Sequence, residues 1–245
     1  MTKIKVKGAV VSNDDADIYD WLGYDYVSPS QVEDALDSDT DEQIQVDINS
    51  GGGSVFAASE IYSMLSAYSG KVTVNIQGLA ASAASVIAMA GDEVNISPTA
   101  QMMIHKASTV SVGNADDLAH DSKMMDSTDQ SIINAYEDKT GMNRDDILQM
   151  MSNETWMTAQ EAVDKGFADN VSAGTKTPQI VNTIGTPLIN SDAIAKIKTL
   201  MAKARDAKPD NKVETPENNV PKPTSSLKDQ KLAILFGKDD ENDGN

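Results

Sequence analysis

Hydrophobic and polar residues alternate with a period of two in several short segments of the first 105 residues, which is the pattern of half-buried β-strands. These segments are IKVKGAVV at residues 4–11, EQIQVDI at 42–48, KVTVNI at 71–76 and two shorter runs within 94–105. In the second of them, Ile44, Val46 and Ile48 share one face. We therefore expect a strand in each segment.

Segments with helical spacing of apolar residues lie between and after the expected strands. They are VFAASEIYSMLSAY at residues 55–68, a long acidic segment at 114–139, and TAQEAVDKGFAD at 158–169. The last helix should end at Gly166, because glycine readily takes the left-handed conformation that stops a helix. Since strands and helices alternate along the chain, the sequence predicts an α/β fold.

The composition changes near residue 175. Six of the eight prolines lie beyond that point, together with a single aromatic residue, Phe236. Residues 206–228 are rich in proline and charge, so we expect a flexible linker there. Residues 192–204 have helical spacing, and the apolar KLAILFG near the end is either a docking peptide or a frayed terminus. We expect three regions: a folded domain at 1–174, a short extension at 175–205, and a largely disordered acidic tail at 206–245.

Charge and residue usage narrow the possible partners and chemistry. The formal net charge of −18 argues against nucleic acid or an anionic membrane, because both are negatively charged. The chain has no cysteine, which excludes disulfides, thiolate catalysis and cysteine-based zinc sites. No apolar segment approaches the roughly 18 residues that a membrane span needs, and the N-terminus lacks a signal-peptide core. We expect a soluble cytoplasmic protein with no cofactor and no bound metal ion.

Three consecutive glycines, Gly51 to Gly53, follow an expected strand and precede an expected helix. Phosphate-binding loops occur at such places, but the lysine and hydroxyl residue of a P-loop are missing here. A simple tight turn is one interpretation. Another is that the backbone N–H groups of the run stabilise a reacting oxygen, which can come close because there are no side chains.

The segment NIQGLAASAASVIAMAG places two serines, Ser82 and Ser85, in an otherwise apolar helix start. Ser82 has the setting of a nucleophile: a strand-to-helix turn, small neighbours, and the N–H of Ala83 available for an oxyanion. The alternative is a small-residue helix that packs closely on the sheet, with the serines as helix caps.

A serine nucleophile needs a base, and the chain contains two histidines, His105 and His120. His105 ends the apolar segment AQMMIH, so its ring can emerge beside the Ser82 turn. His120 lies in an acidic segment, where a solvated position is expected. A carboxylate must orient the base, and Glu154, Asp145 and Asp146 are the candidates that the residues alone leave open.

Four segments, in order over residues 42–172, resemble the Clp-type serine peptidase family. VDINSGGGSV is similar to its strand and INSPGG turn, and GLAASAAS to its nucleophile turn. QMMIHKAS is similar to its VMIHQP segment, and TGMNRDDILQMMSNETWMTAQEAVDKGFADNV to the end of its domain. Gly51 stands where the family has the turn proline.

The resemblance implies a role for each matching residue. Ser82 corresponds to the nucleophile, His105 to the general base and Glu154 to the triad carboxylate, which is an aspartate in the family. The N–H groups of Gly53 and Ala83 correspond to the oxyanion hole. The implied fold is the superhelix of β-β-α units shared with the crotonases, with residues 114–139 as a protruding handle helix. The implied assembly is a homo-oligomeric ring, either a heptamer or stacked rings, and the handle helix lies between stacked rings.

The remaining segments suggest a narrower class. Residues 4–36, the segment ETWMTAQEA and the proline-rich tail resemble the Clp-related head maturation proteases of tailed bacteriophages. That class cleaves scaffold and capsid precursors inside the immature head, in the host cytoplasm. The segment before residue 42 does not resemble the one that engages an ATPase unfoldase, so we expect no such partner. The alternatives are a crotonase-like acyl-CoA enzyme, a housekeeping Clp subunit, and a non-catalytic capsid component.

Overall fold

The computed structural model describes residues 2–37, 43–172, 189 and 191–206. The expected linker at 206–228, apart from its first residue, and the apolar segment at 231–237 lie outside this part of the chain. Within the described residues, no helix has the length and apolar character that crossing a bilayer requires.

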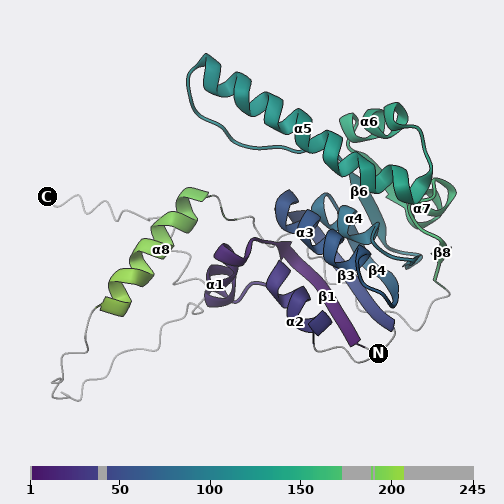
Figure 1. Cartoon of the computed structure of the whole chain (residues 1–245), viewed down its shortest axis with the longest axis horizontal. Helices are drawn as coiled ribbons and strands as arrows, with labels where there is room; N and C mark the ends of the chain where they lie inside the picture. The colour runs from purple at the N-terminus through teal and green to yellow at the C-terminus, as the bar shows by residue number, and fades with distance from the viewer. Residues whose placement is uncertain (1, 38–42, 173–188, 190, 207–245) are drawn as a thin grey trace, which may run out of the picture.

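A mixed sheet forms the centre of the molecule (Figure 1). Its strands are β1 (Thr2–Val10), β2 (Tyr26–Val27), β3 (Gln43–Gly53), β4 (Lys71–Ala81), β5 (Glu93–Ile96), β6 (Gln101–Ile104), β7 (Thr155–Thr158) and β8 (Asn170–Val171). The order is β2-β1-β3-β4-β5-β8, and all of these pairs are parallel. The sheet divides along β4: its first half pairs with β5, and its last residues pair with β6, which in turn carries β7 antiparallel.

Helices cover the sheet and extend from it. They are α1 (Asn13–Leu22), α2 (Pro29–Asp37), α3 (Val55–Ser66), α4 (Ala83–Ala88), α5 (Ala115–Thr140), α6 (Arg144–Ser152), α7 (Ala159–Asp164) and α8 (Ser191–Asp206). The predicted α/β class is confirmed. Gly166 has φ +80 directly after α7 and its C-cap, as expected for the end of that helix. The hydrophobic pattern did not predict α1 and α2, in which about half of the residues are polar.

The core is built from aliphatic side chains on one face of β3 and β4. Ile44, Val46, Ile48, Val72 and Val74 are each 1% exposed or less. The residues between them are polar, so alternate positions along each strand face the core. Alanines of α3 and α4 complete the packing, and small side chains allow these helices to approach the sheet closely. The low aromatic content of the chain is therefore compatible with a continuous core.

The two central strands are longer than their hydrophobic pattern predicts. β3 continues to Gly53 and β4 to Ala81, whereas alternation ends at residues 48 and 76. Glycine and alanine carry little hydrophobic signal, but the ladder between β1 and β3 still continues to the pair Val10 and Gly53. The interpretation of the glycine run as a tight turn is therefore wrong, because all three glycines belong to a strand.

Helix α5 is anchored at one end only. Its buried residues all lie in its second half: Asp129, Ile132, Ile133, Ala135 and Tyr136. The first half extends away from the sheet (Figure 1). A capping box at Asn114 and Asp117 starts the helix, and Gly141 at φ +65 ends it. The first half of the helix and the segment before it carry four exposed apolar side chains: Val110, Val112, Leu118 and Met124.

The helix α8 packs against α1. Ile197 is 3% exposed and contacts Ile18 and Leu22 in a small apolar cluster. The hydroxyl of Tyr19 accepts a hydrogen bond from the Ile189 N–H at 3.2 Å. These contacts connect the helix that spacing predicted at 192–204 to the N-terminal part of the fold.

Candidate active site

Three strands end at the same edge of the sheet and bring distant segments together. β3 ends at Gly53, β4 at Ala81 and β6 at Ile104. These strands are parallel neighbours in the order β3, β4, β6, so the residues that follow them meet at the carboxyl edge. Ligands and reacting groups gather at that edge in sheets of this kind. The glycine run, Ser82 and His105 are therefore side by side in space.

Ser82 occupies a turn with unusual backbone angles, φ +54 and ψ −126. A positive φ is uncommon for a residue with a side chain and persists only where the surroundings enforce it. Its N–H donates to the carbonyl of Met103 on β6 at 2.9 Å. Its side chain makes no capping bond to α4, so the interpretation of Ser82 as a helix cap is wrong.

The side chain of Ser82 instead contacts His105. The Oγ atom lies 2.7 Å from Nε2 of the imidazole, within hydrogen-bonding distance. Both residues are half-buried, which leaves room for a substrate to approach. A hydroxyl and an imidazole at this distance are the pair that nucleophilic catalysis requires. His120 is exposed on the protruding half of α5 and takes no part in this contact.

The glycine run lies directly against the Ser82 turn. A Cβ atom built on Gly52 would lie 2.7 Å from the Ala81 carbonyl oxygen, 2.8 Å from Ser82 Cβ and 2.9 Å from the Ala83 nitrogen. The Gly52 N–H is already used, because it donates to Ser50 Oγ at 3.1 Å. The next N–H along the chain is that of Gly53. The close approach explains the missing side chain at Gly52, and it places the peptide that carries the Gly53 N–H next to the Ala83 nitrogen.

Glu154 lies at the same end of the β6–β7 ladder as His105. β6 and β7 are antiparallel and their register ends with the pair Ile104 and Thr155. His105 directly follows β6 and Glu154 directly precedes β7. Glu154 is exposed, has φ +48, and its carboxylate accepts a hydrogen bond from the Trp156 indole at 3.2 Å.

The other two carboxylates lie elsewhere. Asp145 and Asp146 are exposed in the first turn of α6, where negative charge interacts favourably with the helix dipole. Glu154 follows the opposite end of that helix. Of the three acidic candidates, Glu154 is the one that adjoins the end of the β6–β7 ladder next to His105.

Two polar contacts beneath the site were not predicted from the sequence. Ser85 is fully buried and hydrogen-bonds both to the carbonyl of Ser82 and to the hydroxyl of Tyr136. The Asp129 carboxylate, 3% exposed, accepts a hydrogen bond from the Ala107 N–H at 2.7 Å. Both partners on α5 sit on the face of an apparently ordinary amphipathic helix. The signal available in the sequence was that Asp129 lies at helical spacing from Ile132, Ile133 and Tyr136, which puts an aspartate on the apolar face.

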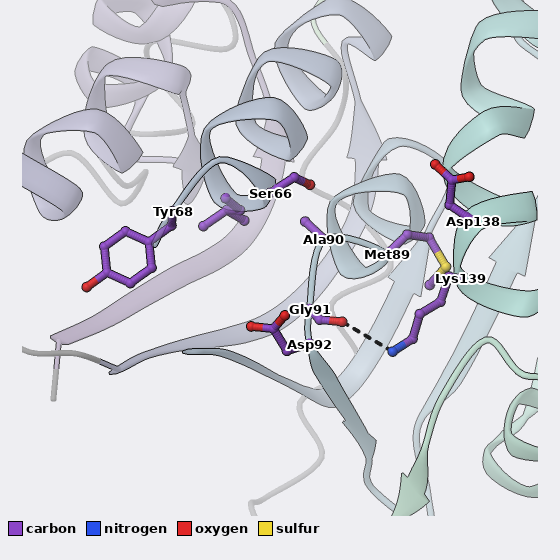
Figure 2. Close-up of a pocket in the computed structure, with 9 residues that line it drawn as sticks. Ser66, Tyr68, Met89, Ala90, Gly91, Asp92, Asp138 and Lys139 are labelled. Atoms are coloured by element: carbon purple, nitrogen blue, oxygen red, sulfur yellow. Dashed lines mark hydrogen bonds between the residues drawn. The ribbon is translucent and has the colours of Figure 1, made fainter. Parts of the chain in front are cut away.

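A separate hollow of about 270 Å³ lies at the opposite edge of the sheet (Figure 2). It is lined by the ends of α3 and α4, the start of β5 and the last turn of α5. Lys139 crosses it and donates to the Gly91 carbonyl at 3.2 Å and to Asp169 at 2.8 Å. The lysine thus joins α5 to the sheet, and the hollow is not continuous with the Ser82 turn, which precedes the other end of α4.

Comparisons with known proteins all find similarity to the same protein family. Residues 33–175 match the sequence model of the family described as Clp protease. The ATP-dependent Clp protease proteolytic subunit 1 of Chlamydia abortus is 34% identical over 128 residues, which cover 51% of this chain and 67% of that protein. The corresponding subunit of Bacteroides fragilis is 34% identical over 139 residues, covering 56% and 67%.

The same fold is found in a solved structure. A ClpP1 mutant from Listeria monocytogenes superposes with a TM-score of 0.58, covering 71% of this chain and 92% of that one. The two sequences are 20% identical over the superposed part, so this likeness concerns the fold. It includes the Clp-like α/β architecture expected from the motifs.

Proposed function

Because the chain belongs to the Clp protease family, and is thus a serine endopeptidase of Clp type, we propose that Ser82, His105 and Glu154 form its catalytic triad. The observation that carries this proposal is the 2.7 Å contact between Ser82 Oγ and His105 Nε2. It occurs at a strained turn where the serine does not cap its helix and its hydroxyl is therefore free to react.

The proposed reaction proceeds through an acyl-enzyme. Neutral His105 takes the proton of Ser82 at Nε2 while Oγ attacks the peptide carbonyl carbon. As the tetrahedral intermediate collapses, the imidazolium returns that proton to the leaving nitrogen and the C–N bond breaks. Water then attacks the ester carbonyl, His105 accepts the proton of the water, and Ser82 regains a proton when the acid product leaves.

The N–H groups of Gly53 and Ala83 are proposed to bind the oxyanion of both tetrahedral intermediates. The proximity of Gly52 to the Ala83 nitrogen supports this assignment, because the peptide that carries the Gly53 N–H begins at Gly52. The engaged Gly52 N–H is not available for the same purpose. Donors that are fixed before the reaction stabilise the developing charge without a cost of reorganisation.

The proposed role of Glu154 is to orient the His105 ring. We expect Glu154→Gln to lower kcat on the order of 10- to 100-fold, less than the roughly 10⁴-fold loss for a buried triad aspartate. The effect should be smaller because Glu154 is exposed and acts only through the imidazole. Steady-state kinetics on a peptide ester measures it. Asp145→Asn and Asp146→Asn are matched controls, and a larger loss in either would move the role to that residue.

The protruding half of α5 is proposed to act as the handle between the rings of an oligomer. Four exposed apolar side chains support this, Leu118 and Met124 in the first half of α5 and Val110 and Val112 in the segment before it, because such residues normally find a partner. Assembly is a necessary part of the proposal. A molar mass in solution equal to that of one chain would contradict it.

We also propose that the substrates are scaffold and capsid precursors of a tailed bacteriophage, cleaved within the assembling head in the cytoplasm of the host. The support is the resemblance of residues 4–36, of the segment at 154–162 and of the proline-rich tail to head maturation proteases. A housekeeping Clp subunit is the alternative, and the relatives named above are subunits of ATP-dependent proteases.

Co-expression with the candidate precursors tests both the proposed catalytic site and the proposed phage substrates. We expect the wild-type chain to cut scaffold and major capsid proteins at defined sites, and Ser82→Ala to cut neither, with the new termini identified by mass spectrometry. Cleavage of casein without cleavage of the precursors would contradict the phage role, but it would still agree with the proposed peptidase activity. Precursor cleavage that is unchanged in Ser82→Ala would contradict the proposed site.

A further inference from the structure

We propose that helix α5 positions the nucleophile and the base through two polar anchors, Tyr136 by way of Ser85 and Asp129 by way of the Ala107 N–H. These residues touch neither substrate nor reacting atoms, so they are positioning residues. The inference rests on the proposed function, because it concerns the alignment of Ser82 with His105.

The first step is the conformation of Ser82, which its surroundings must enforce. The residue has φ +54 and ψ −126. Its N–H is held by Met103, and its carbonyl oxygen accepts two hydrogen bonds from Ser85, at 2.9 Å from the backbone N–H and at 2.6 Å from Oγ. The side chain of Ser85 therefore fixes the peptide that follows the nucleophile, in addition to the normal start of α4.

The direction of the hydrogen bonds follows from their chemistry. A carbonyl oxygen can only accept, so the single proton of Ser85 Oγ points to Ser82. The hydroxyl of Tyr136, 2.8 Å from Ser85 Oγ, must then be the donor of the second bond. Burial raises the pKa of Tyr136 above its usual value, so that hydroxyl stays protonated over the whole working range of pH. The result is a directed chain from Tyr136 through Ser85 to Ser82.

Tyr136 itself has a fixed position. It is 1% exposed, and its ring meets Phe167 edge to face with 5.7 Å between the ring centroids. An aromatic ring held in this way keeps its hydroxyl in place. Any displacement of this part of α5 would therefore reach the carbonyl of Ser82 through one intervening side chain.

The second anchor acts on the base. Ala107 lies two residues after His105, and its N–H donates to the buried carboxylate of Asp129 at 2.7 Å. A hydrogen bond to a charged group is stronger than a neutral one, and its loss would leave a buried charge without this partner. This contact ties the segment that leaves β6 to α5.

Both anchors belong to one face of one helix. Asp129 and Tyr136 are seven residues apart, which is close to two full turns, so their side chains project in the same direction. A single rigid element thus holds the segment that carries Ser82 and the segment that carries His105. The 2.7 Å distance between the reacting side chains is set relative to this shared support.

Tyr136→Phe tests the inference with a minimal change, since it removes one oxygen and keeps the ring. We expect kcat to fall about 3- to 10-fold with KM unchanged, as the loss of one neutral hydrogen bond implies. The rate of acylation by a fluorophosphonate should fall by the same factor. Tyr19→Phe is the matched control, because it removes a buried tyrosine hydroxyl with one hydrogen bond on the other side of the fold. Its kinetic constants should equal those of the wild type.

A double mutant separates positioning from general destabilisation. If the chain acts in series, Ser85→Ala with Tyr136→Phe should be no slower than Ser85→Ala alone, whereas independent effects would multiply. Wild-type acylation rates in Tyr136→Phe, or multiplicative losses in the double mutant, would overturn the inference. Should Ser85→Ala not fold, the single Tyr136→Phe result decides. Ser82→Ala is measured in parallel. If Ser82→Ala is inactive and Tyr136→Phe acylates at the wild-type rate, only the positioning role is rejected. If Ser82→Ala is active, the proposed site itself is rejected.

Discussion

Ser82→Ala should lower kcat/KM for a peptide substrate by about 10⁴- to 10⁶-fold, as for nucleophile removal in other serine peptidases. The reason is that the hydroxyl forms the covalent bond of the acyl-enzyme, so no other interaction can replace it. His105→Ala should cause a loss of similar size, and the double mutant should be no worse, because the two side chains act as one unit. The fold should persist, since Ser82 makes no side-chain cap.

Kinetics with purified variants and covalent labelling together check this expectation. A fluorophosphonate should label Ser82 and leave Ser85 unmodified, because Ser85 is fully buried and hydrogen-bonded to Ser82 and Tyr136. Ser63→Ala is a matched control on the exposed surface of α3, where the hydroxyl donates to the Ser59 carbonyl in its own helix. Peptide hydrolysis by Ser82→Ala at the rate of this control would contradict the proposed nucleophile.

Gly52→Ala should be the second most damaging change, with a loss in kcat/KM of about 10²- to 10³-fold, the size found when one oxyanion donor is removed. The added Cβ would meet the Ala81 carbonyl, Ser82 and the Ala83 nitrogen at 2.7 to 2.9 Å. Gly52 also has φ +95, which an alanine rarely adopts. Relief of this crowding must move the glycine run away from the Ser82 turn and separate the two proposed oxyanion donors.

The neighbouring glycines provide the controls for this prediction. A Cβ on Gly51 would meet nothing within 4 Å, so Gly51→Ala should retain normal kinetics and normal stability. A Cβ on Gly53 would lie 2.1 Å from the carbonyl oxygen of Val10 in β1, so Gly53→Ala should lower the free energy of unfolding. Urea unfolding and kinetics on all three variants make the comparison. Normal activity in Gly52→Ala would contradict the proposed oxyanion site.

Much of the fold could be predicted because burial leaves a local pattern. Period-two alternation located the strand starts, and helical spacing located α3, α5 and α7, since each pattern needs only the residues within one element. The resemblance of four motifs in the same order also assigned Ser82 as the nucleophile and His105 as the base. These two residues are brought together in the structure at 2.7 Å.

What the sequence determined by itself is therefore the class of fold and the choice of Ser82 and His105 as the pair proposed to react. The tertiary structure decided the rest, because it depends on contacts between residues that are far apart in the chain. The motif resemblance proposed Glu154 rather than Asp145 or Asp146, and the structure adds its place beside His105 at the end of the β6–β7 ladder. The place of the glycine run against Ser82, and the link from Tyr136 through Ser85, join segments that are roughly 30 and 50 residues apart. Local hydrophobic patterning shows which faces are buried, and it carries no information on which buried faces meet.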